Sequence, residues 1–276
     1  IANEYSKRKC IIMSEQQPLV SVLMTAYNRQ QYIAAAIESV LASTYTNFEL
    51  IIVDDGSTDN TVNIAKKYLQ QDSRVKVFVN EKNLGDYPNR NKAASYATGK
   101  YIKYFDSDDI LYPHCLGVMV SSMEKFPEAG YGLSCIGDED RPFPVCITPA
   151  QAYKEHFSNK YHFNRAPGSS IIKKDAFDKM GGFSGLRQVG DFEFWLKIGC
   201  YYPLVKFPVD LYWSRLHHHS EKEMNTEKEK LALKKEVLLK TFSKETVPMN
   251  ESEKAAALNS MQKDFLSRIK AKALRR

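Results

Sequence analysis

The stretch Tyr101-Ile-Lys-Tyr-Phe-Asp-Ser-Asp-Asp109 joins a short β-prone run directly to three carboxylates, those of Asp106, Asp108 and Asp109. Like charges raise one another's pKa and burial penalises each charge, so such a cluster needs a positive partner. Mg²⁺ or Mn²⁺ is the simplest candidate, because hard divalent cations prefer oxygen ligands and bridge carboxylates to substrate phosphates. The alternative is an acidic turn that ends a strand and caps the next helix, with its charges in water.

The chain before this stretch alternates short apolar runs with segments of helical periodicity. The predicted strands are Leu19–Met24, Phe48–Val53 and Val75–Val79, and the predicted helices are Gln31–Ser43, a helix capped by Ser57 or Thr58 that ends near Gln70, and Pro88–Ala97. This alternation predicts a parallel, doubly wound α/β sheet with the run before Asp106 as its fourth strand. Ligands of such sheets bind outside the carboxyl ends of the strands, where Thr25–Asn28, Asp54–Asp59 and Asp106–Asp109 fall.

The second half of the chain shows weaker patterns and ends in a segment of different composition. It is predicted to contain helices at Pro113–Lys125, Lys174–Met180 and from Asp191 onward, and strands at Gly168–Lys173 and within Val205–Trp213, whereas Gly130–Phe163 shows no pattern. Residues 221–276 are rich in Lys, Glu, Ala and Leu, contain no glycine and carry a capping pair, Asn250 and Glu253. We therefore divide the chain into a polar lead-in (1–17), a main domain (18–220) and a helical appendage (221–276). The appendage either packs on the main domain or touches an anionic membrane through its basic amphipathic face.

The composition and net charge of the chain indicate which kinds of ligand it can bind. The 276 residues include 43% hydrophobic and 26% charged side chains, with a formal net charge of +6. This mild excess suits an anionic ligand such as a nucleotide diphosphate, and no motif indicates nucleic acid. Five scattered cysteines predict reduced thiols and a cytoplasmic protein. No apolar run has the length of a membrane span and no signal-peptide pattern is visible, so we expect at most peripheral contact with the inner face of a membrane.

An ordered set of motifs resembles the family 2 glycosyltransferases of the GT-A fold. The motifs are Val20–Asn28, Val53–Asp59, Asn83–Gly85 with Arg90–Asn91, Gly99–Asp109, Gly181–Phe183, Gly190–Trp195 and Arg215–His217, which together span Pro18–Ser220. The resemblance implies a mixed α/β sheet flanked by helices. It also implies inverting, metal-dependent transfer of a hexosyl or N-acetylhexosaminyl group from a nucleotide diphosphate. UDP is expected because it is the usual nucleotide in this family. The acceptor would be a hydroxyl of a glycan or lipid-linked glycan, as in bacterial cell-surface polysaccharide synthesis.

The resemblance also implies a role for each matching residue. Six residues match nucleotide-binding positions. Thr25 and Tyr27 would lie beside the base, and Asp55 would accept a hydrogen bond from it. Arg90 would lie near the diphosphate, and Asp106 and Asp108 would also contact the nucleotide. Metal binding falls to Asp108, Asp109 and His217, which would hold Mn²⁺ or Mg²⁺. The extra aspartate leaves open which of Asp108 and Asp109 touches the metal. Arg90 has an alternative role in an ion pair on a helix surface.

Asp191 matches the catalytic base, which removes the proton of the acceptor hydroxyl. A carboxylate at a helix start also acts as an N-cap, and the two roles are compatible. The family usually has Glu before this aspartate, whereas this chain has Gly190. Glu193 is the second candidate for the base, although it would point to a different side of the helix.

Two other classes of function remain open at this stage. A nucleotidyltransferase would carry a glycine-rich phosphate loop after the first strand, but Thr25–Gln31 contains no glycine. A non-catalytic nucleotide-sugar binder would have no need of a base such as Asp191. The chain lacks the Q-x-x-R-W motif of the processive members of the family, so we expect an enzyme that adds a single sugar.

Overall fold

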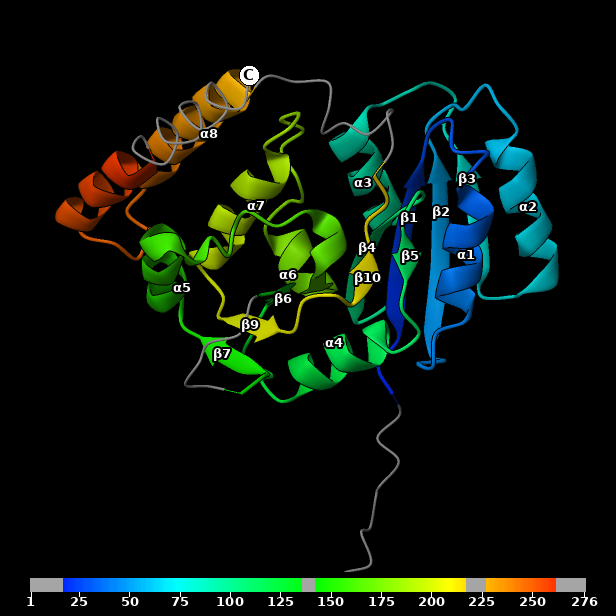
Figure 1. Ribbon diagram of the computed structural model, residues 1–276, viewed down its shortest axis with the longest axis horizontal. Coiled ribbons are helices and arrows are strands. Elements are labelled where there is room, and N and C mark those ends of the chain that lie inside the picture. The colour runs from blue at the N-terminus through cyan, green and yellow to red at the C-terminus, as the bar shows by residue number, and fades with distance from the viewer. Residues whose placement is uncertain (1–16, 136–141, 217–226, 262–276) are drawn as a thin grey trace, which may run out of the picture.

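The computed structural model describes residues 17–135, 142–216 and 227–261. Its centre is an eight-stranded sheet with the order β3-β2-β1-β4-β8-β6-β9-β7 (Figure 1). The strands are β1 Val20–Ala26, β2 Phe48–Asp54, β3 Val75–Val79, β4 Tyr101–Asp106, β6 Tyr131–Ser134, β7 Val145–Ile147, β8 Ser170–Lys173 and β9 Leu204–Phe207. Two short strands, β5 Ile110–Leu111 and β10 Tyr212–Trp213, pair separately and antiparallel.

The first half of the sheet is parallel, as the alternating pattern predicts. β1 pairs in parallel with β2 and with β4, and β2 pairs in parallel with β3. Every residue of β2 is buried, as expected for a strand covered on both faces. Thr25 lies opposite Val53 on one side and Asp106 on the other. The carboxyl ends of β1, β2 and β4 are therefore level with one another.

The second half of the sheet is mixed, which corrects the fully parallel arrangement that the alternation predicts and confirms the mixed sheet implied by the family resemblance. β8 runs antiparallel to β4 and β6, and β7 runs antiparallel to β9. The segment without a readable pattern supplies β6 and β7. Strands of three or four residues are too short to show a periodicity, and their direction is set by their neighbours.

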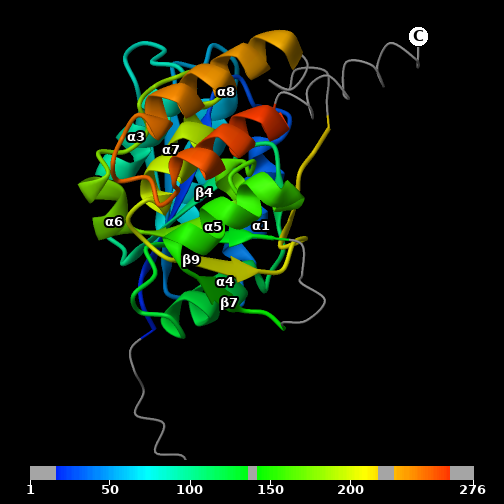
Figure 2. The same cartoon turned by 90° about the vertical axis from the view of Figure 1, so that its left-hand side faces the viewer.

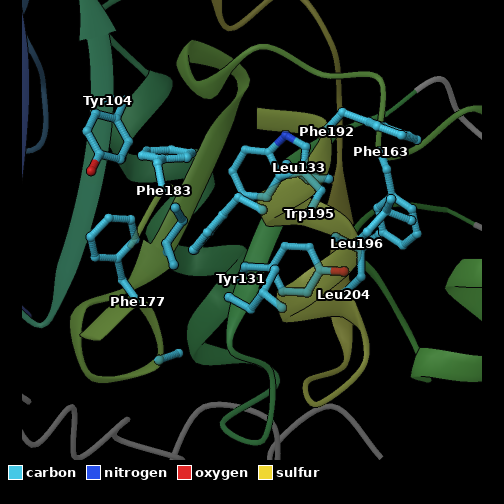
Figure 3. Close-up of a cluster of buried hydrophobic side chains, with 14 of the residues drawn as sticks. Tyr104, Tyr131, Leu133, Phe163, Phe177, Phe183, Phe192, Trp195, Leu196 and Leu204 are labelled. Atoms are coloured by element: carbon cyan, nitrogen blue, oxygen red, sulfur yellow. The ribbon is translucent and has the colours of Figure 1, made fainter. Parts of the chain in front are cut away.

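Helices cover both faces of the sheet, and the alternation of β1 assigns the faces. Val22 and Met24 point to one layer and Leu23 to the other. The first layer contains α1 Ile33–Leu41, α2 Thr61–Gln71 and α4 Cys115–Glu124. The second contains α3 Asp86–Ser95, α5 Pro149–Glu155 with a π-turn at His156–Lys160, α6 Lys174–Lys179, α7 Gly190–Gly199 and α8 Glu227–Phe242. The second layer has an aromatic core in which Trp195 stacks on Tyr131 (Figure 3).

The C-terminal helix α8 is packed on the main domain. Figure 2 shows α8 lying over α7, and Val237, Leu238 and Phe242 are buried in the same core cluster as the second helix layer. The predicted capping pair is confirmed, because Asn250 and Glu253 exchange two hydrogen bonds of 2.8 and 2.9 Å at the start of a further helix, 251–261. Among the helices of the described ranges, none combines the length and apolarity needed to cross a bilayer.

We predict that Leu238→Ala lowers the free energy of unfolding by about 2–5 kcal/mol, because it leaves a cavity between α8 and the core. Leu238 is fully buried, whereas the next residue, Leu239, is 51% exposed. Leu239→Ala is therefore the matched control and should change stability by no more than about 0.5 kcal/mol. Urea unfolding measures both variants, and equal small effects would contradict the docking of α8.

Candidate functional site

The loops that follow β1 and β2 are tied together by side chains. Asn28 has a positive φ of 52°, and its backbone N–H donates to Ser57 Oγ at 2.8 Å while its Oδ1 accepts from the Thr58 backbone N–H at 2.9 Å. The prediction that Ser57 or Thr58 caps α2 is therefore wrong. The helix begins only at Thr61, whose N–H donates to Asp59 Oδ1 at 3.0 Å. The two hydroxyl residues instead link the loop after β2 to Asn28 in the loop after β1.

Asp55 organises the next loop with a buried carboxylate. Its Oδ1 accepts from Asn80 Nδ2 and from the Leu84 backbone N–H, both at 2.8 Å, and its Oδ2 accepts from the Gly85 N–H at 2.9 Å. A carboxylate oxygen has two lone pairs, so Oδ2 keeps the capacity to accept one more bond. The predicted contact with a nucleobase is compatible with this structural role.

Thr25 and Tyr27 lie beside Asp55 at the carboxyl end of β1. The Asp55 backbone N–H donates to the carbonyl of Ala26 at 2.8 Å, which places the two strand ends in contact. Thr25 is half-buried and Tyr27 is 45% exposed. Tyr27 thus presents an aromatic surface to solvent next to a buried acceptor, an arrangement that suits stacking and recognition of a base.

Each carboxylate of the acidic turn meets a different partner. The turn is closed by a backbone bond from the Asp109 N–H to the Asp106 carbonyl at 3.2 Å, and the side chains diverge from it. The chain therefore supplies part of the positive charge that the cluster requires. The bonds run from Arg90 Nη2 to Asp106 Oδ1 (2.8 Å), from Arg29 Nε to Asp108 Oδ2 (3.0 Å) and from the Arg215 backbone N–H to Asp109 Oδ1 (2.9 Å).

Arg90 forms a buried ion-pair triad instead of the surface pair considered above. Its Nε donates to Asp86 at 2.7 Å, its Nη2 reaches Asp106, and its guanidinium carbon lies 5.8 Å from the centroid of the Tyr104 ring. Burial opposes ionisation of Asp106, but the charge and hydrogen bond of Arg90, together with the charges of Lys103 and Arg29, outweigh it and lower the pKa of that carboxyl. Arg90 Nη1 is buried without a hydrogen-bond partner, so one donor is available to an anionic group.

Lys103 is a buried cation that the sequence interpretation missed. It is fully buried in β4, and its Nζ donates to the carbonyls of Tyr104, at 3.0 Å, and Gly168. Burial lowers its pKa, while the nearby Asp106 and Asp109 carboxylates act in the opposite direction. The available signal was a single lysine within an otherwise apolar strand.

Asp191 lies in the first turn of α7, which begins at Gly190, so it is not the N-cap residue. Its Oδ1 accepts from the Phe192 backbone N–H at 2.7 Å, and its own N–H donates to Tyr87 Oη at 3.0 Å. Burial raises the pKa of the Asp191 carboxyl, and the hydrogen bond from Phe192 and the charge of Lys234 act against that rise. The result is a half-buried carboxylate with enhanced basicity.

Tyr87 explains why glycine precedes Asp191. A Cβ atom on Gly190 would lie 2.8 Å from the Tyr87 ring, so any larger residue would displace that ring. Tyr87 and Arg90 are three residues apart on α3 and therefore share a helix face. One contacts Asp191 and the other contacts Asp106. The helix α3 thus connects the predicted base to the acidic turn.

Glu193, the second candidate for the base, has a different neighbour. Its carboxylate accepts a hydrogen bond from Ser184 in the loop before α7. His217 lies outside the described residues. Within those residues no group of three or more His, Cys, Asp or Glu side chains is arranged to hold a metal ion. The donor set still fits Mg²⁺ or Mn²⁺, because such ions take one or two protein carboxylates and complete their shell with substrate phosphates and water.

The chain is similar to known proteins in sequence and in fold. The sequence model described as "Glycosyl transferase family 2" matches residues 21–189. The chain is 44% identical over 108 residues to the UDP-Glc:alpha-D-GlcNAc-diphosphoundecaprenol beta-1,3-glucosyltransferase WfgD of Escherichia coli, a match that covers 39% of this chain and 42% of that protein. The chain spans between 34% and 66% of the length of four curated relatives to which it is similar.

Two solved structures share the fold. TarS of S. aureus, residues 1–349 in complex with UDP-GlcNAc, superposes with a TM-score of 0.69 at 20% identity and covers 88% of this chain and 71% of that one. The mannosyltransferase PcManGT of Pyrobaculum calidifontis, in complex with GDP-Man and Mn²⁺, superposes with a TM-score of 0.64 at 16% identity and covers 93% and 76%. At these identities the likeness concerns the fold.

We predict that Asp55→Asn lowers the free energy of unfolding by about 2–4 kcal/mol, because an amide NH₂ group then faces a backbone N–H donor of Leu84 or Gly85. The matched control is Glu81→Gln, which makes the same change of charge on an exposed side chain of the same loop. Urea unfolding of both variants tests the role of Asp55, and an unchanged midpoint for Asp55→Asn would refute it.

Proposed function

The chain belongs to glycosyl transferase family 2, and we propose that it transfers a sugar from a nucleotide diphosphate to an acceptor hydroxyl with inversion at the anomeric carbon. The observation that carries this proposal is the double contact of α3, with Tyr87 against Asp191 and Arg90 against Asp106. It joins a candidate base to a candidate diphosphate site through one rigid helix. We place the catalytic domain at residues 18–220.

The donor is proposed to be a UDP-sugar. Tyr27 would cover the base, Asp55 Oδ2 would accept a hydrogen bond from it, and the unpartnered Nη1 of Arg90 would face the diphosphate. The names of the E. coli relative, which includes UDP-Glc, and of the TarS complex, which includes UDP-GlcNAc, support the choice of uridine. Thr25, which lies level with Asp106, would complete the wall beside the ribose.

Asp191 is proposed to act as the general base. The acceptor oxygen attacks the anomeric carbon while its proton passes to Asp191, and the bond from that carbon to the diphosphate oxygen breaks. The electron pair leaves with the nucleotide diphosphate, so the products are a glycoside, the diphosphate and protonated Asp191. Burial raises the pKa of this carboxyl, which strengthens it as a base.

Asp108 is the carboxylate that we propose for the metal. Its side chain is 17% exposed, whereas Asp109 is only 5% exposed and is engaged by the Arg215 backbone. Asp109 and the unplaced His217 would complete the protein part of the site. When bound, Mn²⁺ or Mg²⁺ would neutralise charge on the leaving diphosphate. The Mn²⁺ in the PcManGT complex supports the choice of cation.

The acceptor is proposed to be a glycan or a lipid-linked glycan of cell-surface polysaccharide synthesis. The support is the name of the E. coli relative, which describes a diphosphoundecaprenol-linked acceptor. A screen of UDP-, GDP- and TDP-sugars with Mn²⁺, read as diphosphate release or as a thermal shift, would identify the donor. Stabilisation by a GDP- or TDP-sugar but by no UDP-sugar would refute the choice of base.

We predict that Asp191→Asn lowers the transfer rate by about 10²- to 10⁴-fold, because the amide cannot accept the acceptor proton. Donor affinity should change little, since the substitution preserves shape. Glu193→Gln is the control and should keep most of the activity. Steady-state rates with calorimetric donor binding test both, and equal turnover of Asp191→Asn and the wild-type protein would reject Asp191 as the base.

We predict that Asp108→Asn weakens Mn²⁺-dependent binding of UDP by at least about tenfold, because one carboxylate oxygen is lost from the metal shell. Titration calorimetry with MnCl₂ and with EDTA measures the metal-dependent part. Asp175→Asn, on an aspartate of α6 whose side chain is 67% exposed, controls for the change of net charge. An affinity of Asp108→Asn that equals the wild-type value in both media would exclude this residue as a ligand.

A further inference from the structure

The C-terminal helix α8 places a cation against Phe192, the residue that follows Asp191. Lys234 Nζ lies 4.8 Å from the centroid of the Phe192 ring and donates to Asn164 Oδ1 at 2.6 Å. Phe192 directly follows Asp191 in α7 and donates its backbone N–H to the Asp191 carboxylate. The residues matched by the family model end at 189, so this cation comes from a segment beyond them.

Three groups on neighbouring helices act on Asp191, and a fourth, His156, lies against the ring of Phe192. The helix α3 contributes the Tyr87 hydroxyl and the Arg90 guanidinium, and α8 contributes Lys234. His156, in the π-turn after α5, has its ring 5.9 Å from that of Phe192, and burial lowers its pKa so far that it is neutral at pH 7. The two cations therefore come from different helices.

The positive charge of Arg90 is shared between two other carboxylates, those of Asp86 and Asp106. Lys234 is anchored differently, by the amide oxygen of Asn164 and the aromatic ring of Phe192. The His156 ring contacts the rings of both Phe163 and Phe192, which are labelled in Figure 3, and Phe163 directly precedes Asn164, so the anchor points of Lys234 are tied to the aromatic core. The ammonium is thus held in a defined place against Phe192, whose backbone N–H donates to the Asp191 carboxylate.

We propose that Lys234 is a positioning residue for Asp191, whose ammonium keeps the carboxylate ionised and ready to accept a proton, and that α8 is accordingly part of the active site. The role of Asp191 as base rests on the proposed function, whereas the electrostatic coupling between the two side chains does not. The contributions to the Asp191 pKa have the direction that this role requires, because burial raises the pKa and the charge of Lys234 acts to lower it.

The effect of the Lys234 charge on the pKa of Asp191 has a direction that can be measured. Asp191 is active when deprotonated, so a higher pKa moves the loss of activity on the acid side to a higher pH. Removing one cation beside a buried carboxylate is expected to raise its pKa by on the order of one unit. Lys234→Met removes the charge but retains an apolar stem over Phe192, whereas Lys234→Arg keeps the charge.

The test measures the Asp191 carboxyl directly in the full chain. Protein labelled with ¹³C at the aspartate carboxyl carbon is titrated by NMR, and the signal that is absent from Asp191→Asn identifies the residue. We expect Lys234→Met to raise the midpoint by on the order of one unit and Lys234→Arg to restore it. Lys235→Met is the matched control, because Lys235 is the next residue of α8 and is exposed. It should leave the midpoint unchanged.

An unshifted midpoint in Lys234→Met, or equal shifts in Lys234→Met and Lys235→Met, would overturn the proposal. The rate profile against pH, with the donor found in the screen, gives a second readout. A shift of its acid limb supports the role of Lys234, whereas a uniform loss at all pH values would mean a merely structural role and would also overturn it. Absence of transfer in the wild-type protein would instead refute the proposed function and leave the NMR result standing.

Discussion

A buried guanidinium between two carboxylates is the interaction on which the site depends. Arg90 joins Asp86 on its own helix to Asp106 at the end of β4, and its charge lowers the pKa of Asp106 against the effect of burial. Lys103 lies beneath the same turn. These cations allow several carboxylates to gather at one strand end before any metal binds. Separating such an ion pair would leave a buried charge without a partner, which is unfavourable. The triad therefore also holds α3 against the sheet.

The parallel register then decides which side chains meet. β1, β2 and β4 end level, so Thr25, Asp55 and the acidic turn at 106–109 share one edge although they are far apart in sequence. The loops after β1 and β2 are crosslinked through Asn28, and the loop after β3 is held by Asp55. The edge proposed to bind the donor is therefore built by backbone geometry and a few polar crosslinks. The proposed base, Asp191, lies instead on α7, within the aromatic helix layer.

Two further contacts join these parts of the structure. Tyr87 occupies the space that a side chain at position 190 would need, so the glycine before Asp191 is a consequence of packing on α3. The helix α8 buries Leu238 in the core and brings Lys234 to Phe192. A segment interpreted from composition as an appendage thus contacts the residue that follows the proposed base. Short-range contacts across three helices connect what sequence motifs describe as separate elements.

The sequence by itself determined the parallel half of the sheet, the strand-end location of the acidic residues, the helix that carries Asp191 and the capping pair at Asn250. These follow from local periodicity and turn chemistry, which short segments encode. Only the tertiary structure decided the mixed second half of the sheet, the burial of Arg90, the burial of Lys103 and the contact of Lys234 with Phe192, next to Asp191. Each of these depends on residues far apart in the chain, whose contacts are chosen by packing and charge compensation and leave no periodic trace in the sequence.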